Sequence, residues 1–198
     1  MVITGIKVQR RNKRRFSIYV DGQYRMSIGV EILTRFNLKE GDEISEEFFT
    51  RILKDEERQA LKNRLARILS YRDRTPKEIR ERLRNLGYSD EIISEVIDEY
   101  IEKKIIDEER LVQSFIADYT NLNPRGNIFI KRTLLAKGIE AGLIDQYLKD
   151  RDEAAVIRRF LEKKRAKIKE QDRARIYRLL INRGFTPKVV SEVVGEEF

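Results

Sequence analysis

The sequence contains no cysteine and no histidine among its 198 residues. The absence of cysteine excludes a disulfide framework, and the absence of both residues excludes the zinc sites that need them. The commonest general bases and nucleophiles of enzymes are therefore missing. Neither form of glycine-rich phosphate-binding loop, GxxxxGK followed by Ser or Thr, or GxGxxG, occurs in the chain. We therefore expect a protein that is not an enzyme, with no catalytic residues, no bound metal and no cofactor.

Long apolar runs are also absent, since no stretch approaches the ~20 residues that a membrane-spanning helix needs. The opening residues Met1–Thr4 do not begin a signal peptide. We therefore expect a cytoplasmic protein without a membrane partner. Proline is scarce, with three in the whole chain, and helical periodicity runs through most of the sequence. This combination predicts a mainly α-helical fold.

Charge, by contrast, is abundant. Charged residues make up 38% of the sequence, above the quarter or so that is typical, and the net charge is +8. A positive surplus of this size favours an anionic partner, either nucleic acid or a filament that carries it. The alternative is a basic, solvated surface without a partner.

The strongest pattern is a phrase that occurs three times. Leu83–Tyr88 returns as Leu134–Ile139 and again as Leu180–Phe185, with glycine as the fifth residue and an apolar pair several residues later. A spacing of about fifty residues indicates a repeated supersecondary unit. A helix often ends at a left-handed glycine, and the next residue then packs on the third residue from the helix end. The phrase therefore predicts three helix ends, which we call the glycine stops.

Helix starts agree with these stops. Thr75–Glu78 forms a capping box with proline at the first helical position, and opens a helix whose apolar face is Ile79, Leu83 and Leu86. Asp107 is the predicted N-cap of a helix in the second copy, and the middle helix of the third copy is predicted near Gln171–Arg183. Each copy therefore consists of three helices.

The whole chain is predicted as a mainly α, elongated array of three three-helix repeats, stacked end to end. The repeats are residues 57–101, 102–149 and 150–198, preceded by a connecting helix at 46–56 and a β-hairpin-containing module at 1–45. In that module Asp21-Gly22 is the predicted hairpin turn. Ser45 caps the next helix, on an apolar face with Phe48, Phe49, Ile52 and Leu53. That helix is either a separate connector or continuous with the first repeat.

These residues resemble a known family. Tyr71–Ile79, followed by Leu83 and Gly87-Tyr88, is similar to the signature of the RecX family, bacterial regulators of the RecA recombinase. Arg125-Gly126, Ile130, Leu134 and Lys137–Ile139 resemble that family's central motif. The resemblance extends from about Arg58 to Val194. It implies a protein of DNA repair and recombination that binds RecA filaments on single-stranded DNA and restrains ATP hydrolysis and strand exchange.

The charges follow the repeats. The middle helices and their entries are basic, whereas the third helix of the first repeat carries Asp90, Glu91 and Glu95. Stacked repeats could align the basic helices into one partner-binding surface, and the alternative is salt bridging between neighbouring helices. The predicted partner-binding residues are Arg72, Arg74, Lys77, Arg80, Arg84, Arg125, Lys131, Arg132, Lys137, Arg158, Arg159, Lys163, Lys164 and Arg173.

Two functions fit that surface. The first is the regulator of RecA filaments that the resemblance implies, and the second is a sequence-independent DNA-binding protein of stacked repeats. In helix-turn-helix domains the last helix reads the major groove. Here the last helix of the first repeat is acidic, and phosphate charge would oppose its insertion. We therefore expect no sequence-specific reading of a groove. Single-stranded DNA as a partner is what the resemblance implies, duplex DNA is left open, and we expect the protein to be a monomer.

Overall fold

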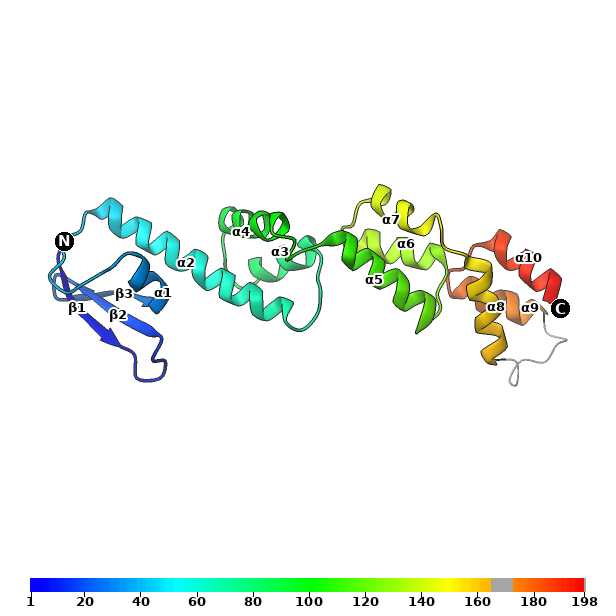
Figure 1. Ribbon diagram of the computed structural model, residues 1–198, viewed down its shortest axis with the longest axis horizontal. Coiled ribbons are helices and arrows are strands. Elements are labelled where there is room, and N and C mark those ends of the chain that lie inside the picture. Colours follow the sequence, from blue (N-terminus) through cyan, green and yellow to red (C-terminus); the bar gives the residue numbers. More distant parts are fainter. Residues whose placement is uncertain (165–172, 198) are drawn as a thin grey trace. The chain divides into compact units, whose positions relative to one another are not determined.

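The computed structural model describes residues 1–164 and 173–197, which form three strands and ten helices (Figure 1). The prediction of a mainly α-helical chain with a small strand-bearing start is confirmed. The chain divides into two compact units. Unit 1 comprises Met1–Arg72 and Leu83–Val96, and unit 2 comprises Asp73–Arg82 and the chain from Ile97 onward. None of the helices in the described ranges is long and apolar enough to span a bilayer.

Unit 1 begins with a three-stranded antiparallel sheet in the order β1-β2-β3. The strands are β1 (Ile3–Val8), β2 (Arg15–Val20) and β3 (Gln23–Gly29). Between β2 and β3, Asp21 and Gly22 have φ angles of +49° and +79°. Two positive φ angles are typical of the tight hairpin turn that matches strand twist. The predicted turn is therefore confirmed.

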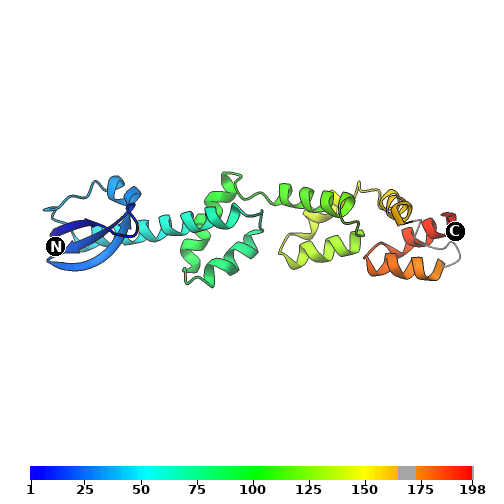
Figure 2. The same cartoon turned by 90° about the horizontal axis from the view of Figure 1, so that it is seen from below.

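Two helices follow the sheet in unit 1, α1 (Val30–Arg35) and α2 (Glu46–Leu69). Ser45 Oγ accepts a hydrogen bond from the Phe48 amide at 3.1 Å, as an N-cap does. Figures 1 and 2 show the sheet beside the first half of α2, while the second half extends beyond the sheet. Since α2 is unbroken, the helix that Ser45 caps is continuous with the first helix of the first repeat.

The core of the N-terminal module joins the sheet to these helices. Ile3, Ile18 and Ile28 from the strands are buried together with Ile32 of α1 and Ile52 of α2. Burial of such side chains supplies most of the favourable free energy of folding. Leu53, on the predicted apolar face of this helix, is 41% exposed and lies outside the cluster.

The first repeat continues with α3 (Pro76–Arg84) and α4 (Asp90–Glu102). The predicted capping box is present: Thr75 Oγ1 accepts from the Glu78 amide at 3.2 Å, and the Thr75 amide donates to Glu78 Oε2 at 3.2 Å. The predicted apolar face ends earlier than expected. Leu86 is 44% exposed, because it follows the last residue of α3.

The second repeat contains α5 (Glu108–Asn121), α6 (Asn127–Ala136) and α7 (Ala141–Leu148). Asp107 Oδ1 accepts from the Arg110 amide at 3.0 Å, so the predicted N-cap of α5 is confirmed. The fully buried side chains of this repeat form one cluster of their own. They include Val112, Ile130, Leu134, Ile139 and Ile144.

The third repeat contains α8 (Glu153–Lys164), α9 (Arg173–Asn182) and α10 (Pro187–Glu197). The predicted start of its middle helix at Gln171 lies outside the described residues. This repeat also has its own cluster of buried side chains, which include Val156, Ile157, Phe160, Leu180, Phe185 and Val190.

All three glycine stops are confirmed. Gly87, Gly138 and Gly184 have φ angles of +89°, +86° and +77° after α3, α6 and α9. In the first stop the Tyr88 amide donates to the Leu83 carbonyl at 3.3 Å, and the other two stops repeat that bond at 3.1 and 3.2 Å. This six-to-one bond defines the glycine-ended helix terminus.

Candidate interaction surface

Within unit 2, the start of α6 lies directly on the glycine stop of α9. The Gly126 amide donates to the Arg183 carbonyl, and the Ile128 amide donates to the Gly184 carbonyl, both at 3.1 Å. A Cβ atom on Gly126 would lie 2.0 Å from the Gly184 carbonyl oxygen. The first amides of a helix lack partners within that helix, so the carbonyls of the stop satisfy them. We call this contact a joint.

A second joint links the start of α3 to the glycine stop of α6, again within unit 2. The buried Thr75 hydroxyl donates to the Lys137 carbonyl at 2.7 Å, and Lys77 Nζ donates to the Ala136 carbonyl at 3.2 Å. Lys137 Nζ forms a salt bridge with Glu78 Oε1 at 2.5 Å. At this joint the donors to the carbonyls of the stop are side chains, whereas at the α6–α9 joint they are backbone amides. Two predicted partner residues, Lys77 and Lys137, are part of this joint.

Four other predicted partner residues are ion-paired with the third helix of their own repeat. The pairs are Arg80 with Asp98 at 3.6 Å, Arg84 with Asp90 at 2.6 Å, Lys131 with Asp145 at 2.6 Å, and Arg158 with Glu196 at 2.7 Å. Exposed pairs of this kind contribute about 0–1 kcal/mol each. At these positions an external partner would compete with a weak internal one.

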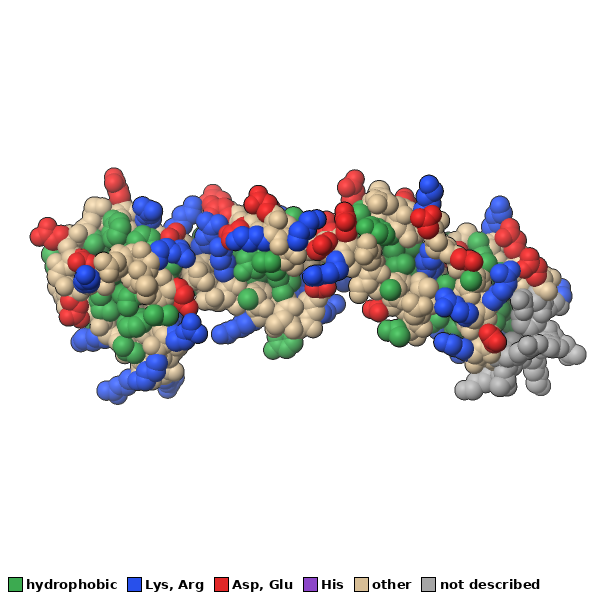
Figure 3. All heavy atoms as spheres, viewed as in Figure 1, with side chains coloured by type: hydrophobic (Ala, Val, Ile, Leu, Met, Phe, Trp, Pro, Cys, Tyr) green, Lys and Arg blue, Asp and Glu red, His purple; other side chains and the backbone are tan. Residues whose placement is uncertain are grey.

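Arg132, Arg159, Lys163 and Arg173 are exposed and make no ion pair with the other described residues. Arg72 is exposed as well, whereas Lys164 lies over the Phe160 ring, with 5.5 Å between Nζ and the ring centroid. On the face drawn in Figure 3, basic side chains are interspersed with acidic ones. That face therefore carries mixed charge and no continuous basic surface.

Three predicted arginines, Arg74, Arg80 and Arg125, are partly buried. Each has a buried Nε atom without a hydrogen-bond partner among the described residues. The Arg125 guanidinium stacks over Phe129 at 4.8 Å, and Arg183 stacks over Phe160 at 4.6 Å. Burial, followed by the nearby Arg125 charge, lowers the pKa of Arg183 from its usual value. The α6–α9 joint therefore holds two neighbouring cations on aromatic rings.

Sequence reasoning missed Arg151, the centre of a hydrogen-bond network between α5, α6 and α8. Its guanidinium donates to Thr120 Oγ1 at 2.8 Å, to Asn127 Oδ1 at 2.5 Å and to the Arg125 carbonyl at 2.7 Å. Burial lowers the pKa of Arg151. The charged segment around Arg151 carries no sequence signal for burial, because its partners lie more than twenty residues away.

Glu153 was missed for the same reason. It is 5% exposed and accepts from the Asn127 amide at 2.6 Å and from the Thr186 amide at 3.3 Å. Those two amides stand at the starts of α6 and α10, where an anionic acceptor is favoured by the helix dipole. Arg151 and Glu153 thus fix the second repeat to the third, next to the α6–α9 joint.

The chain is similar to several described proteins. Models of the RecX regulatory protein N-terminal domain and of the first three-helix domain of RecX match residues 1–45 and 62–99. The Regulatory protein RecX of Clostridioides difficile (strain 630) is 32% identical over 202 residues, covering 98% of this chain and 95% of that relative. The Regulatory protein RecX of Bacillus mycoides (strain KBAB4) is also 32% identical, with 98% and 76% covered.

Two solved structures have a similar fold. A crystal structure of regulatory protein RecX superposes with a TM-score of 0.72 at 23% identity, covering 98% of both chains. A crystal structure of RecX from Lactobacillus salivarius superposes with a TM-score of 0.60 at 22% identity, covering 71% of this chain and 96% of that one. At these identities the two structures support the fold alone.

Proposed function

Since this chain belongs to the RecX family of regulatory proteins, we propose that it regulates the RecA recombinase by binding RecA filaments on single-stranded DNA. In this proposal it inhibits ATP hydrolysis and strand exchange. The observation that carries the proposal is the 32% identity to a regulatory protein RecX over 98% of the chain. The ATP is bound by the filament, so the regulator needs no cofactor of its own.

The repeated helices supply a physical reason for a repeated ligand. A filament presents the same surface at regular intervals, and a chain of linked repeats can contact several such surfaces at once. Each contact then raises the effective concentration of the next, so that weak contacts add up to strong binding. Arg132 of α6 and Arg159 and Lys163 of α8 are exposed and unpaired within the described part of the chain. They are the cations we assign to the filament.

The second candidate is a sequence-independent DNA-binding protein that acts without RecA. The net charge of +8 favours it, since cations that neutralise phosphates release counterions whatever the base sequence. In α4 the acidic residues Asp90, Glu91 and Glu95 oppose insertion of that helix into a groove. DNA contact in this candidate is therefore with the backbone of the nucleic acid.

The decisive experiment measures RecA ATP hydrolysis on single-stranded DNA with increasing amounts of this protein. We expect a dose-dependent fall, and electron microscopy of the same filaments should show added density along them. Undiminished hydrolysis at molar excess over RecA, together with bare filaments, would reject the filament proposal. DNA binding that persists under those conditions would favour the second candidate.

A further inference from the structure

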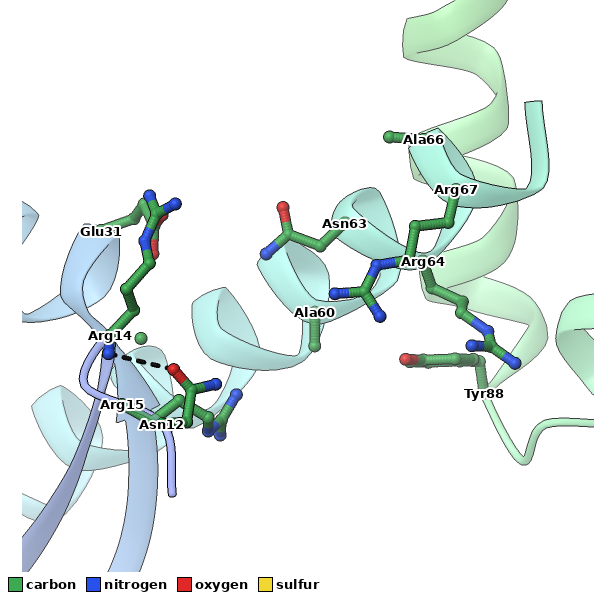
Figure 4. Close-up of a pocket in the computed structure, with 11 residues that line it drawn as sticks. Asn12, Arg14, Arg15, Glu31, Ala60, Asn63, Arg64, Ala66, Arg67 and Tyr88 are labelled. Carbon is green, nitrogen blue, oxygen red and sulfur yellow. Dashed lines mark hydrogen bonds and ion pairs between the residues drawn. The ribbon is translucent and has the colours of Figure 1, made fainter. Parts of the chain in front are cut away.

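Unit 1 contains a hollow of about 490 Å³ that none of the predicted partner residues lines (Figure 4). Its walls come from the β1–β2 loop, the start of α1, the second half of α2 and Tyr88, which follows the first glycine stop. This volume lies in the range of ~300–1,000 Å³ that is usual for small-ligand sites. The hollow is therefore large enough to hold a nucleotide.

The lining is strongly cationic. Arg14, Arg15, Arg64 and Arg67 line the hollow against a single carboxylate, that of Glu31. Arg14 pairs with Glu31 at 3.0 Å, and Arg15 pairs with Glu56 outside the hollow at 3.1 Å. The guanidinium groups of Arg64 and Arg67 make no ion pair or hydrogen bond with the described residues, whereas phosphate oxygens would give each of them a bidentate partner.

Tyr88 differs from its counterparts in the other two repeats. Ile139 and Phe185 occupy the same place after their stops and are 2% and 0% exposed, whereas Tyr88 is partly exposed. A Cβ atom on Gly184 would meet Phe129 of the neighbouring repeat at 2.5 Å, but one on Gly87 would meet nothing within 4 Å. The first stop is thus uncovered, and it holds an aromatic ring on a fixed backbone at the wall of the hollow.

Arginine side chains next to a partly exposed aromatic ring are typical of sites that bind single-stranded nucleic acid. Bases stack on aromatic side chains while cations follow the phosphates, and the stacking tolerates any base. Figure 4 shows Arg64 and Arg67 reaching from α2 toward the side of the hollow that Tyr88 forms. The amides of Asn12 and Asn63 in the same lining can donate to and accept from base edges. A base inside a duplex is already stacked and is not available to the ring.

We propose that this hollow binds one nucleotide of single-stranded DNA, with its base on Tyr88 and its flanking phosphates on Arg64 and Arg67. The assignment rests on the proposed function only in taking single-stranded DNA as the partner. It adds a DNA contact in unit 1, at residues that the repeated basic pattern does not include.

The test measures fluorescence anisotropy of a labelled oligothymidylate of about ten nucleotides with the full-length protein and no RecA. Tyr88→Ala should weaken binding by about tenfold through loss of stacking, and Tyr88→Phe should bind like the parent. Arg64→Ala with Arg67→Ala should lower the slope of log affinity against log salt by about 0.7 for each phosphate released. The control Arg51→Ala with Lys54→Ala removes the same charge from α2 outside the hollow, and should change binding little.

An oligonucleotide of the same length with abasic sites separates stacking from charge. The parent should bind it about tenfold more weakly than oligothymidylate, and Tyr88→Ala should not distinguish the two probes. Circular dichroism checks that each variant is folded. Equal affinity of the parent for both probes, or parental affinity in Tyr88→Ala, would overturn the proposal.

Inhibition of RecA ATP hydrolysis, measured on the same variants, keeps the two proposals separate. Oligonucleotide binding that depends on Tyr88 supports the hollow as a nucleotide site even if RecA is unaffected by the parent protein. Variants that bind DNA like the parent but no longer inhibit RecA would identify the hollow as a protein contact instead, and the nucleotide assignment would be wrong.

Discussion

Gly126 and Gly184 meet backbone to backbone: a Cβ atom on Gly126 would lie 2.0 Å from the Gly184 carbonyl oxygen. Gly126 has a φ angle of −80°, which any residue can adopt, so glycine is needed there for space and not for conformation. The glycine at position 126 allows the start of α6 to seat on the stop of α9. Gly184, by contrast, has a φ of +77°, so glycine is needed there for its left-handed conformation.

Gly126→Ala should therefore destabilise the protein by about 1–3 kcal/mol, because the methyl group forces backbone apart at the joint. Gly142→Ala is the matched control. Gly142 lies in α7, where a Cβ would meet only Glu140 Oε1 at 3.9 Å, and alanine favours the helix by up to about 1 kcal/mol. Urea unfolding followed by circular dichroism measures both variants. Equal midpoints for the two would contradict the role of the joint.

The first and third glycine stops should differ in the stability that they lose when the glycine is replaced by alanine. Gly87→Ala, like Gly87→Val, meets only the left-handed backbone penalty of about 1 kcal/mol or more, since nothing lies within 4 Å of its Cβ position. Gly184→Ala meets that penalty and also a collision with the Phe129 amide at 2.7 Å. We expect Gly184→Ala to lower the thermal midpoint by more than Gly87→Ala does. The reverse order would show that the stops are not docked as described.

Local signals made much of the fold predictable. Each stop is decided by a glycine and its immediate neighbours, and the Thr75–Glu78 box and the Asp107 cap are formed by residues three apart in sequence. The hairpin at Asp21-Gly22 is equally local. For the same reason the first repeat was recognisable from a short signature, because that signature spans a helix from its cap to its stop.

The remainder depends on contacts that sequence spacing does not encode. Leu53 belongs to a helical apolar pattern, yet it is 41% exposed, and the pattern alone does not tell which apolar positions other parts of the chain cover. The sequence around Arg151 is typical of a charged surface segment, but the Arg151 guanidinium donates hydrogen bonds to polar groups that are far away in the sequence. In the hollow, Asn12, Arg64 and Tyr88 come from three separate segments, and no motif connects them.

The N-cap of α5 predicts a pH effect. The hydrogen bond from the Arg110 amide is the main cause that lowers the pKa of Asp107 below its usual value. A carboxyl whose pKa is lower in the folded state stabilises the protein above its unfolded pKa, near 3.9, and loses that contribution as pH falls through the folded value. Asp107→Asn should therefore be less stable than the parent at pH 7, with the difference shrinking below about pH 4.

Chemical unfolding at several pH values measures this difference. Asp42→Asn is not a suitable control, because Asp42 accepts from the Lys39 amide at 2.7 Å. Asp118→Asn, which removes a carboxylate from α5 away from its cap, is the matched control. A stability difference for Asp107→Asn that stays constant from neutral to acidic pH would exclude an ionised cap.

The filament proposal predicts which cations matter. Arg132, Arg159 and Lys163 are exposed and have no ion-pair partner among the described residues, whereas Arg84 and Lys131 already pair with carboxylates. Changing the three unpaired cations to Glu should reduce inhibition of RecA ATP hydrolysis by about an order of magnitude, because each lost contact also weakens the linked ones. Circular dichroism checks that the variant is folded.

Two comparisons make that result specific. Reversing Asp90, Glu91 and Glu95 of α4 to Lys changes as many charges, and should weaken inhibition much less if α4 faces away from the filament. Arg132→Lys, Arg159→Lys and Lys163→Arg together keep every charge, and should inhibit like the parent if the contact is with phosphate or carboxylate charge. If the triple Glu variant inhibits as well as the parent, these cations are only a solvated surface. The filament contact would then have to be made by another part of the chain.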